Sequence, residues 1–389
     1  MQKPVRAELV EAPYFRLVQA QNMQDPATAL TLPDPLPLDS GATLSPVTIA
    51  YERYGQLSPE RDNAVLIFHA LTGDQYVASP HPATGKPGWW DRMVGPGKPI
   101  DTNRFCVIST NVIGGCMGST GPASEGPDGK PYGQRFPVVT IHDMVRAIAG
   151  LLDVLGIDKV HAAVGGSMGG MQAMAFASDF PRRAERVLVL ASAARQSAQN
   201  IAFHEVGRQA IMADANWNGG AYYDGAHPDA GLAVARMAAH ITYLSEAGLT
   251  EKFGRRLQQR PDGSDGAKSF GFEADFQVES YLRYQGSGFT RRFDANSYLY
   301  ITRAIDYFDL AETHGGRLAD AFAHTSSRFC IVSFDTDWLY TTEESRHIVR
   351  ALNAAGAPVS FVELSSPYGH DGFLLDTPGL DEVVQGFVS

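Results

Sequence analysis

Four glycines surround a serine in the stretch GGSMGG at residues 165–170. An apolar run precedes them and an alanine-rich run follows, so residues 165–169 match the G-x-S-x-G turn between a strand and a helix. Larger side chains at the glycine positions would collide with the neighbouring strand and helix in so tight a turn. The pattern therefore predicts that Ser167 is a nucleophile whose hydroxyl is exposed above a sheet.

Two other interpretations of this stretch involve no nucleophile. One is a glycine-rich turn that only permits close packing, and the other is a phosphate-binding loop. The chain contains neither G-x-x-x-x-G-K-[ST] nor G-x-G-x-x-G, so its sequence offers little support for nucleotide binding.

A serine hydroxyl is a weak nucleophile and needs a histidine base and a carboxylate that orients the base. After this kind of turn the acid and then the histidine follow later strands. The apolar run 328–334 is followed by Asp335 and Asp337, and the run 358–364 is followed by the loop that carries His370. We expect His370 to be the base and Asp337, rather than Asp335, to be the acid.

The negative oxygen of an acyl-transfer intermediate needs two hydrogen-bond donors. The backbone N–H of Met168 comes directly after the nucleophile, at the positive end of the following helix. We expect the second donor to be the backbone N–H of Leu71, in the loop after the early apolar run. The alternative is that this loop is only a turn.

The elements that would position these residues alternate between strands and helices. Helical periodicity fills residues 141–155, with a capping box at Thr140 and Asp143 and a C-terminal glycine at Gly156. Short apolar runs typical of strands buried on both faces of a parallel sheet occupy residues 64–70, 104–110, 159–165, 186–192, 328–334 and 358–364. The sequence predicts an α/β fold with a mostly parallel sheet.

Strand-like runs disappear between residues 195 and 322, where helical stretches such as 231–249 alternate with turns. We therefore expect a core in two parts, 1–194 and 323–389, with a helical lid inserted at 195–322. The polar stretch 258–269 is expected to be an exposed loop.

Composition restricts the partners. The net charge of −11 disfavours a nucleic-acid or anionic-membrane partner, and no run approaches the length of a membrane span. Three cysteines without C-x-x-C spacing argue against disulfides and a zinc site, so we expect no metal. The first 23 residues lack the apolar segment of a signal peptide, and we expect a cytoplasmic protein.

Several stretches together resemble the homoserine O-acyltransferases: HALTGD, GWWDRMVGPGKPIDTNRFCVISTNVIGGCMGSTGP, GGSMGGMQA, ARMAAHITYLS, DTDWLY and GHDGFL. The segment 88–122 is far more specific than G-x-S-x-G alone. Phe176 departs from the family pattern, in which tryptophan is expected. The resemblance implies an α/β-hydrolase fold with a helical lid, a role in methionine biosynthesis and a homodimer.

The resemblance also implies residue roles. It assigns the triad to Ser167, Asp337 and His370, and it adds Arg236 and Asp371 as residues that bind the amino acid. One arginine and one aspartate suit homoserine, which carries a carboxylate and an ammonium group. L-Homoserine and acetyl-CoA are the implied substrates, and no further cofactor is expected.

The stretch NVIGGCMGSTGP at residues 111–122 is expected to line the pocket near the serine. Cys116 within it is expected to be a small packing residue, since no separate base is evident for a second nucleophile.

The acyl group is a separate question. Relatives thought to prefer succinyl-CoA tend to carry an arginine two positions after the triad acid, in a pattern like DWRF. Leu339 occupies that position here and offers an apolar wall, so we expect acetyl transfer. Alternatives are an O-succinyltransferase acting on homoserine or serine, an esterase or thioesterase on the same fold, and an inactive hydrolase fold used for binding.

Overall fold

The computed structural model describes residues 29–259 and 266–389. The segment that was searched for a signal peptide lies outside the described residues. The expected exposed loop at 258–269 also lies outside them in its central part, residues 260–265.

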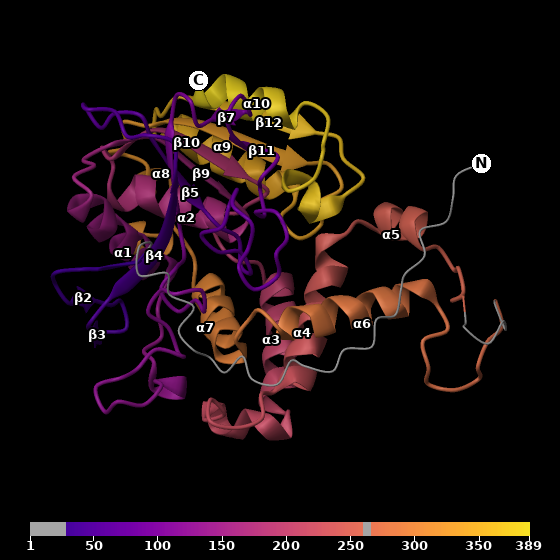
Figure 1. The fold of residues 1–389 in the computed structure, drawn as a ribbon. Helices are drawn as coiled ribbons and strands as arrows, with labels where there is room; N and C mark the ends of the chain where they lie inside the picture. The colour runs from indigo at the N-terminus through magenta and orange to yellow at the C-terminus, as the bar shows by residue number, and fades with distance from the viewer. Residues whose placement is uncertain (1–28, 260–265) are drawn as a thin grey trace.

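An eight-stranded sheet forms the centre of the molecule (Figure 1). Its strands, in spatial order, are β1 (Ala29–Thr31), β4 (Thr48–Tyr54), β8 (Cys106–Thr110), β5 (Ala64–Phe68), β9 (Val160–Gly166), β10 (Ala184–Leu190), β11 (Arg328–Phe334) and β12 (Val359–Leu364). The pairs β1–β4 and β4–β8 are antiparallel, and the other five pairs are parallel. The prediction of a mostly parallel α/β sheet is confirmed.

All six apolar runs form strands of the parallel part, but one of them is not buried on both faces. β12 is the edge strand, and none of its residues is fully buried. The sequence analysis missed β4 because its residues, TIAYERY, mix polar and apolar side chains as expected of a strand near an edge. Four short strands lie outside the main sheet: β2 (Leu36–Pro37), β3 (Thr43–Leu44), β6 (Val94–Gly95) and β7 (Ile100–Asp101).

Successive side chains of a strand point to opposite faces, and β5 therefore contributes to two apolar clusters. Leu66 packs in the cluster that contains α1 (Ile141–Val154), α2 (Met168–Asp179) and α9 (Thr342–Ala354). Val65 and Ile67 pack in the cluster that contains α10 (Leu380–Val388). The sheet that carries the nucleophile is thus buried between two layers.

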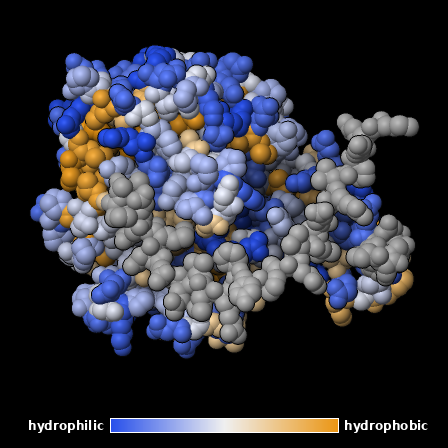
Figure 2. Space-filling view, in the orientation of Figure 1, coloured by the Kyte–Doolittle hydropathy of each residue, from blue (hydrophilic) through white to orange (hydrophobic). Residues whose placement is uncertain are grey.

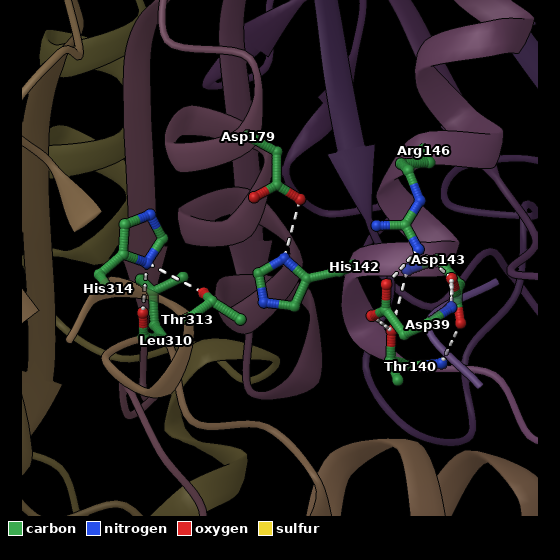
Figure 3. Close-up of polar contacts among 9 residues, drawn as sticks. All are labelled: Asp39, Thr140, His142, Asp143, Arg146, Asp179, Leu310, Thr313 and His314. Carbon is green, nitrogen blue, oxygen red and sulfur yellow. Dashed lines mark hydrogen bonds and ion pairs between the residues drawn. The ribbon is translucent and has the colours of Figure 1, made fainter. Parts of the chain in front are cut away.

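Side-chain contacts fix the N-terminus of α1 (Figure 3). The side chain of Thr140 accepts a hydrogen bond from the backbone N–H of Asp143, and the Asp143 carboxylate accepts one from the backbone N–H of Thr140, which confirms the predicted capping box. Arg146 bridges Asp143 and Asp39, the latter in the turn between β2 and β3. Gly156 ends the helix with a φ of 67°, as its position predicts.

Helices fill the chain between β10 and β11; α3 to α7 lie together beside the sheet, whereas α8 lies apart from them and packs against α9 (Figure 1). They are α3 (Ala198–Met212), α4 (Asp229–Tyr243), α5 (Glu246–Lys252), α6 (Gln277–Thr290), α7 (Ala295–Asp306) and α8 (Leu318–Ala321). The stretch 231–249 is not one helix, because Leu244 is extended and Ser245 caps the start of α5. Among the described residues, four short 3₁₀ helices occupy Gly133–Arg135, Ala215–Gly220, Glu312–His314 and Gly369–Phe373.

The face of the molecule in Figure 2 is mainly hydrophilic, with limited hydrophobic patches. Within the two described ranges, no helix combines the length and apolar character that crossing a membrane requires. The same residues include no group of three or more His, Cys, Asp or Glu side chains placed to hold a metal ion.

Candidate active site

Ser167 stands alone between the end of β9 and the start of α2. Its φ of 58° and ψ of −124° lie in a region that residues with a Cβ rarely adopt. Its backbone N–H donates to the carbonyl of Leu190 at 2.9 Å, which ties the turn to β10. The strand-to-helix turn that the sequence predicts is therefore present, and it turns the Ser167 side chain away from the sheet ladder.

The two glycines of the motif are required by backbone contacts. A Cβ on Gly165 would lie 2.1 Å from the carbonyl oxygen of Gly169, and one on Gly169 would lie 2.2 Å from the carbonyl oxygen of Phe68. Backbone atoms cannot yield as a flexible side chain can, so any larger residue would open the turn.

The other two glycines are required by side chains. A Cβ on Gly166 would lie 2.4 Å from the ring of Phe373, in the loop that carries the histidine. A Cβ on Gly170 would lie 2.6 Å from the Cβ of Ser192. All four glycines thus allow neighbouring segments to approach Ser167 closely.

The structure brings the three predicted triad residues together. His370 Nε2 lies 2.9 Å from Ser167 Oγ, and His370 Nδ1 lies 2.8 Å from Asp337 Oδ2. All three residues are buried, with exposed fractions of 7% for Ser167, 3% for His370 and 4% for Asp337. This is the geometry in which a histidine can take a serine proton while a carboxylate holds the opposite ring nitrogen.

Backbone donors hold the carboxylate of Asp337 in place. Its Oδ1 accepts from the backbone N–H groups of Leu339 at 2.9 Å and Tyr340 at 3.0 Å, which leaves Oδ2 for the histidine. Asp335 lies at the exposed start of the same loop, where it accepts from the hydroxyl of Ser365 and the backbone N–H of Ser366. The choice of Asp337 over Asp335 thus agrees with the geometry.

The two predicted oxyanion donors lie at the expected elements. Met168 is the first residue of α2, where backbone N–H groups have no partner within the helix. Leu71 lines the same cavity as Ser167. The part that the two backbone N–H groups play in stabilising an oxyanion stays a prediction.

His69 supports the loop of Leu71, and the sequence analysis did not single it out. Its Nδ1 lies 2.7 Å from the carbonyl oxygen of Ala70, and its Nε2 accepts from the backbone N–H of Val112. Burial lowers the pKa of His69 and so favours the neutral ring that can both donate and accept. The only sequence signal was its place in the HALTGD stretch.

The prediction that the segment 111–122 lines the pocket near Ser167 stays a prediction. None of its described residues lines the cavity at Ser167. Instead the carbonyl oxygen of Met117 accepts from the side chain of Gln75, so the segment supports the Leu71 loop from behind. Burial raises the pKa of the Cys116 thiol to about 12, which suits a packing residue and not a nucleophile.

Arg236, on α4, extends toward the Leu71 loop. Its Nη1 donates to Thr72 Oγ1 at 3.2 Å, and its guanidinium carbon lies 4.7 Å from the centre of the Phe289 ring and 5.6 Å from that of Tyr243. Tyr243 itself lines the cavity at Ser167. Arg236 is thus held at the edge of this cavity by one polar contact and two aromatic faces.

Asp371 follows His370 directly, in the 3₁₀ helix Gly369–Phe373. Burial raises the pKa of Asp371 to about 6, although the positive charge of Arg236 acts in the opposite direction. No ion pair of Asp371 is found among the described parts of the chain. A partly buried carboxylate without a cation partner is suited to a positively charged ligand.

The two remaining predicted positions have different surroundings. Leu339 lines the cavity at Ser167, with part of its side chain against the core. Phe176 is fully buried and packs against Phe68 and Phe180, so its departure from the family pattern affects the core behind the turn.

Comparisons with known proteins agree with this geometry. A family model described as the alpha/beta hydrolase fold matches residues 63–377. A homoserine O-acetyltransferase of Zymomonas mobilis is 64% identical over 92% of this chain and 95% of its own length.

Two solved structures are also similar. The homoserine O-acetyltransferase of Bacillus anthracis has 26% identity and a TM-score of 0.83, covering 93% of this chain and 96% of its own. Esterase E22 has 30% identity and a TM-score of 0.81, covering 93% of this chain and 99% of its own.

Proposed function

Because the chain belongs to the homoserine O-acetyltransferase family of α/β-hydrolase-fold enzymes, we propose that it transfers an acetyl group from acetyl-CoA to the hydroxyl of L-homoserine. The product is O-acetyl-L-homoserine, an intermediate on the route to methionine. The observation that carries the mechanism is the buried hydrogen-bonded relay from Ser167 through His370 to Asp337. The proposed steps use only side chains and backbone groups of this chain.

The first half-reaction acetylates the enzyme. His370 Nε2 takes the proton of Ser167, and Oγ attacks the thioester carbonyl carbon. The resulting oxyanion accepts hydrogen bonds from the backbone N–H groups of Met168 and Leu71. The carbon–sulfur bond then breaks, and the CoA sulfur leaves with the proton from His370.

The second half-reaction repeats these steps with a different nucleophile. The hydroxyl of homoserine gives its proton to His370 and attacks the acetyl-enzyme carbonyl, and Ser167 recovers its proton as the ester product leaves. Homoserine carries a carboxylate and an ammonium group, which a simple alcohol lacks. Arg236 suits its carboxylate and Asp371, next to His370, its ammonium group, because neither side chain has an ion-pair partner in the described ranges.

Water competes with homoserine for the acetyl-enzyme, so the site has to exclude it. Ser167 is only 7% exposed. Helix α4 packs against the 3₁₀ helix that carries His370, and Trp338 Nε1 donates to the carbonyl of Leu244. These contacts support a lid role for the inserted helices.

The alternative of an esterase deserves a direct test, because esterase E22 is 30% identical over nearly the whole chain. Incubation with acetyl-CoA should release free thiol slowly alone and much faster with L-homoserine, with one O-acetylhomoserine formed per thiol. An esterase or thioesterase would release acetate at a rate that homoserine does not change, and an inactive binding protein would release no thiol.

The acid limb of the pH profile should report Asp371. Its pKa of about 6 means that the carboxyl becomes neutral as the pH falls through that value, and its attraction for the substrate ammonium is then lost. We expect kcat/KM for L-homoserine to fall below pH 6 more steeply than the rate of enzyme acetylation from acetyl-CoA. Both steps need His370, so their ratio isolates the acceptor site.

In Asp371→Asn this ratio should be low and independent of pH, because the amide does not titrate. A ratio that keeps the wild-type pH dependence in this variant would assign the titration to another group.

Acetyl-CoA should be preferred over succinyl-CoA by about 100-fold or more in kcat/KM, because an unpaired buried carboxylate costs several kcal/mol. Leu339 lines the cavity and offers that carboxylate no cation. Leu339→Arg should narrow the preference, and it keeps the backbone N–H that holds Asp337. Val154→Arg, at an exposed site on α1, adds the same charge elsewhere and should leave the preference unchanged. A wild-type preference for succinyl-CoA would overturn the donor assignment.

A further inference from the structure

A second arginine contacts the same loop residue as Arg236, and the mechanism above does not use it. Arg292 follows α6, two residues after its last residue. Its Nη1 donates to the carbonyl oxygen of Thr72 at 3.0 Å, and its guanidinium carbon lies 5.1 Å from the centre of the Phe289 ring. Thr72 is the neighbour of Leu71, so Arg292 reaches from the lid to the predicted oxyanion loop.

Arg292 and Arg236 share their partners. Both donate to Thr72, Arg236 to the hydroxyl and Arg292 to the carbonyl, and both guanidinium groups lie over the ring of Phe289. Burial lowers the pKa of Arg292, and the positive charge of Arg236 lowers it further. Two like charges held this close repel each other unless an anion joins them.

No carboxylate of the described residues joins the two guanidinium groups by direct contact. Within residues 29–259 and 266–389, neither guanidinium group forms an ion pair with a carboxylate. Asp74 instead contacts His81 at 3.1 Å, and Asp294 accepts from the hydroxyl of Tyr222 at 2.5 Å. The nearby acids act on the two arginines only through space, so both guanidinium groups keep N–H groups that no carboxylate of the described ranges accepts from.

We propose that Arg292 is a second ligand of the acceptor's α-carboxylate and that it acts together with Arg236. This inference rests on the proposed function. A carboxylate has two oxygens and accepts charge-assisted hydrogen bonds from two guanidinium groups, which relieves their repulsion. Because both arginines also hold Thr72, the carboxylate would bind beside the Leu71 loop, and the substrate hydroxyl could extend toward Ser167. The acceptor specificity then derives from both arginines and Asp371.

The test compares L-homoserine with L-homoserine amide, in which a neutral amide replaces the carboxylate. In Arg292→Gln, kcat/KM for L-homoserine should fall about 10- to 100-fold, as expected for a lost hydrogen bond to a charged group. The kcat/KM for the amide should change by less than about threefold. The preference for homoserine, which is the ratio of the two kcat/KM values, should therefore shrink by nearly as much as kcat/KM for homoserine falls. Arg292→Lys keeps the charge and should recover part of that preference.

Arg291→Gln is the matched control, since Arg291 is the adjacent arginine and is exposed. It should leave the preference unchanged, and thiol release from acetyl-CoA without acceptor should stay near the wild-type rate in Arg291→Gln. Equal losses for homoserine and its amide would overturn the proposal and make Arg292 a support for the Thr72 loop. If Arg292→Gln does not fold, the ratio of kcat/KM for homoserine to that for its amide is measured in Arg292→Lys. A ratio below that of the wild type supports the proposal, and an unchanged ratio overturns it. A wild type that cannot be acetylated by acetyl-CoA would instead refute the proposed function.

Discussion

Ser167→Ala is expected to lower kcat/KM for acetyl transfer by at least about a thousandfold, because loss of a triad nucleophile typically costs several powers of ten. Without Oγ, no acetyl-enzyme can form, and His370 Nε2 loses the group that it contacts at 2.9 Å. The fold should remain intact, because alanine keeps the Cβ of serine and places no new atom in the crowded turn. Thermal denaturation would check this directly.

The covalent step has its own measurement. Mass spectrometry of the wild type mixed with acetyl-CoA alone should find one acetyl group on the peptide that contains Ser167, and none in the variant. Ser178→Ala is the matched control, because Ser178 lies on α2 and its hydroxyl has no hydrogen-bond partner among the described residues. Activity of Ser167→Ala within about tenfold of wild type would rule out the acyl-enzyme.

Asp337→Asn should lower kcat by about 10⁴-fold, the size of effect expected when the histidine tautomer is wrong. The backbone N–H groups of Leu339 and Tyr340 require an acceptor at the position of Oδ1, so the amide oxygen of asparagine should take that position. The amide NH₂ would then face His370 Nδ1 and donate to it. His370 would carry its proton on Nε2 and could not accept one from Ser167.

Asp335→Asn is the control for this prediction, two positions away in the same loop. Asp335 is exposed and accepts hydrogen bonds only from the 365–366 segment among its described contacts, so activity should stay within a few-fold of wild type. Comparable losses in the two variants would contradict the assignment of the triad acid. Retained activity in Asp337→Asn alone would do the same.

Local patterns in the sequence were enough to predict most of the core. The strands of the parallel part are continuous apolar runs because both faces of the sheet are covered, and such runs are visible without any tertiary information. The helix α1 was predicted from its periodicity and capping box, which are also local features. Ser167 and His370 could be named because the elbow has a short motif and the histidine follows a strand late in the chain.

Features that depend on contacts between distant segments were decided only by the tertiary structure. β4 and β12 differ from the predicted pattern because they lie near or at an edge of the sheet, and neighbours in space determine that burial.

The sequence analysis preferred Asp337 over Asp335, and the contact that places the Asp337 carboxylate against the histidine depends on how the turn after β11 meets the loop after β12. The surroundings of Arg292 could not be predicted either, since Thr72 lies 220 positions away and the shared contact with Arg236 involves a third segment. The sequence by itself determined which residue types could perform acyl transfer and which elements carry them. Their partners, protonation and burial follow from segments that are distant along the chain and meet only in the folded structure, because hydrogen bonds and desolvation depend on distance in space and not on separation along the chain.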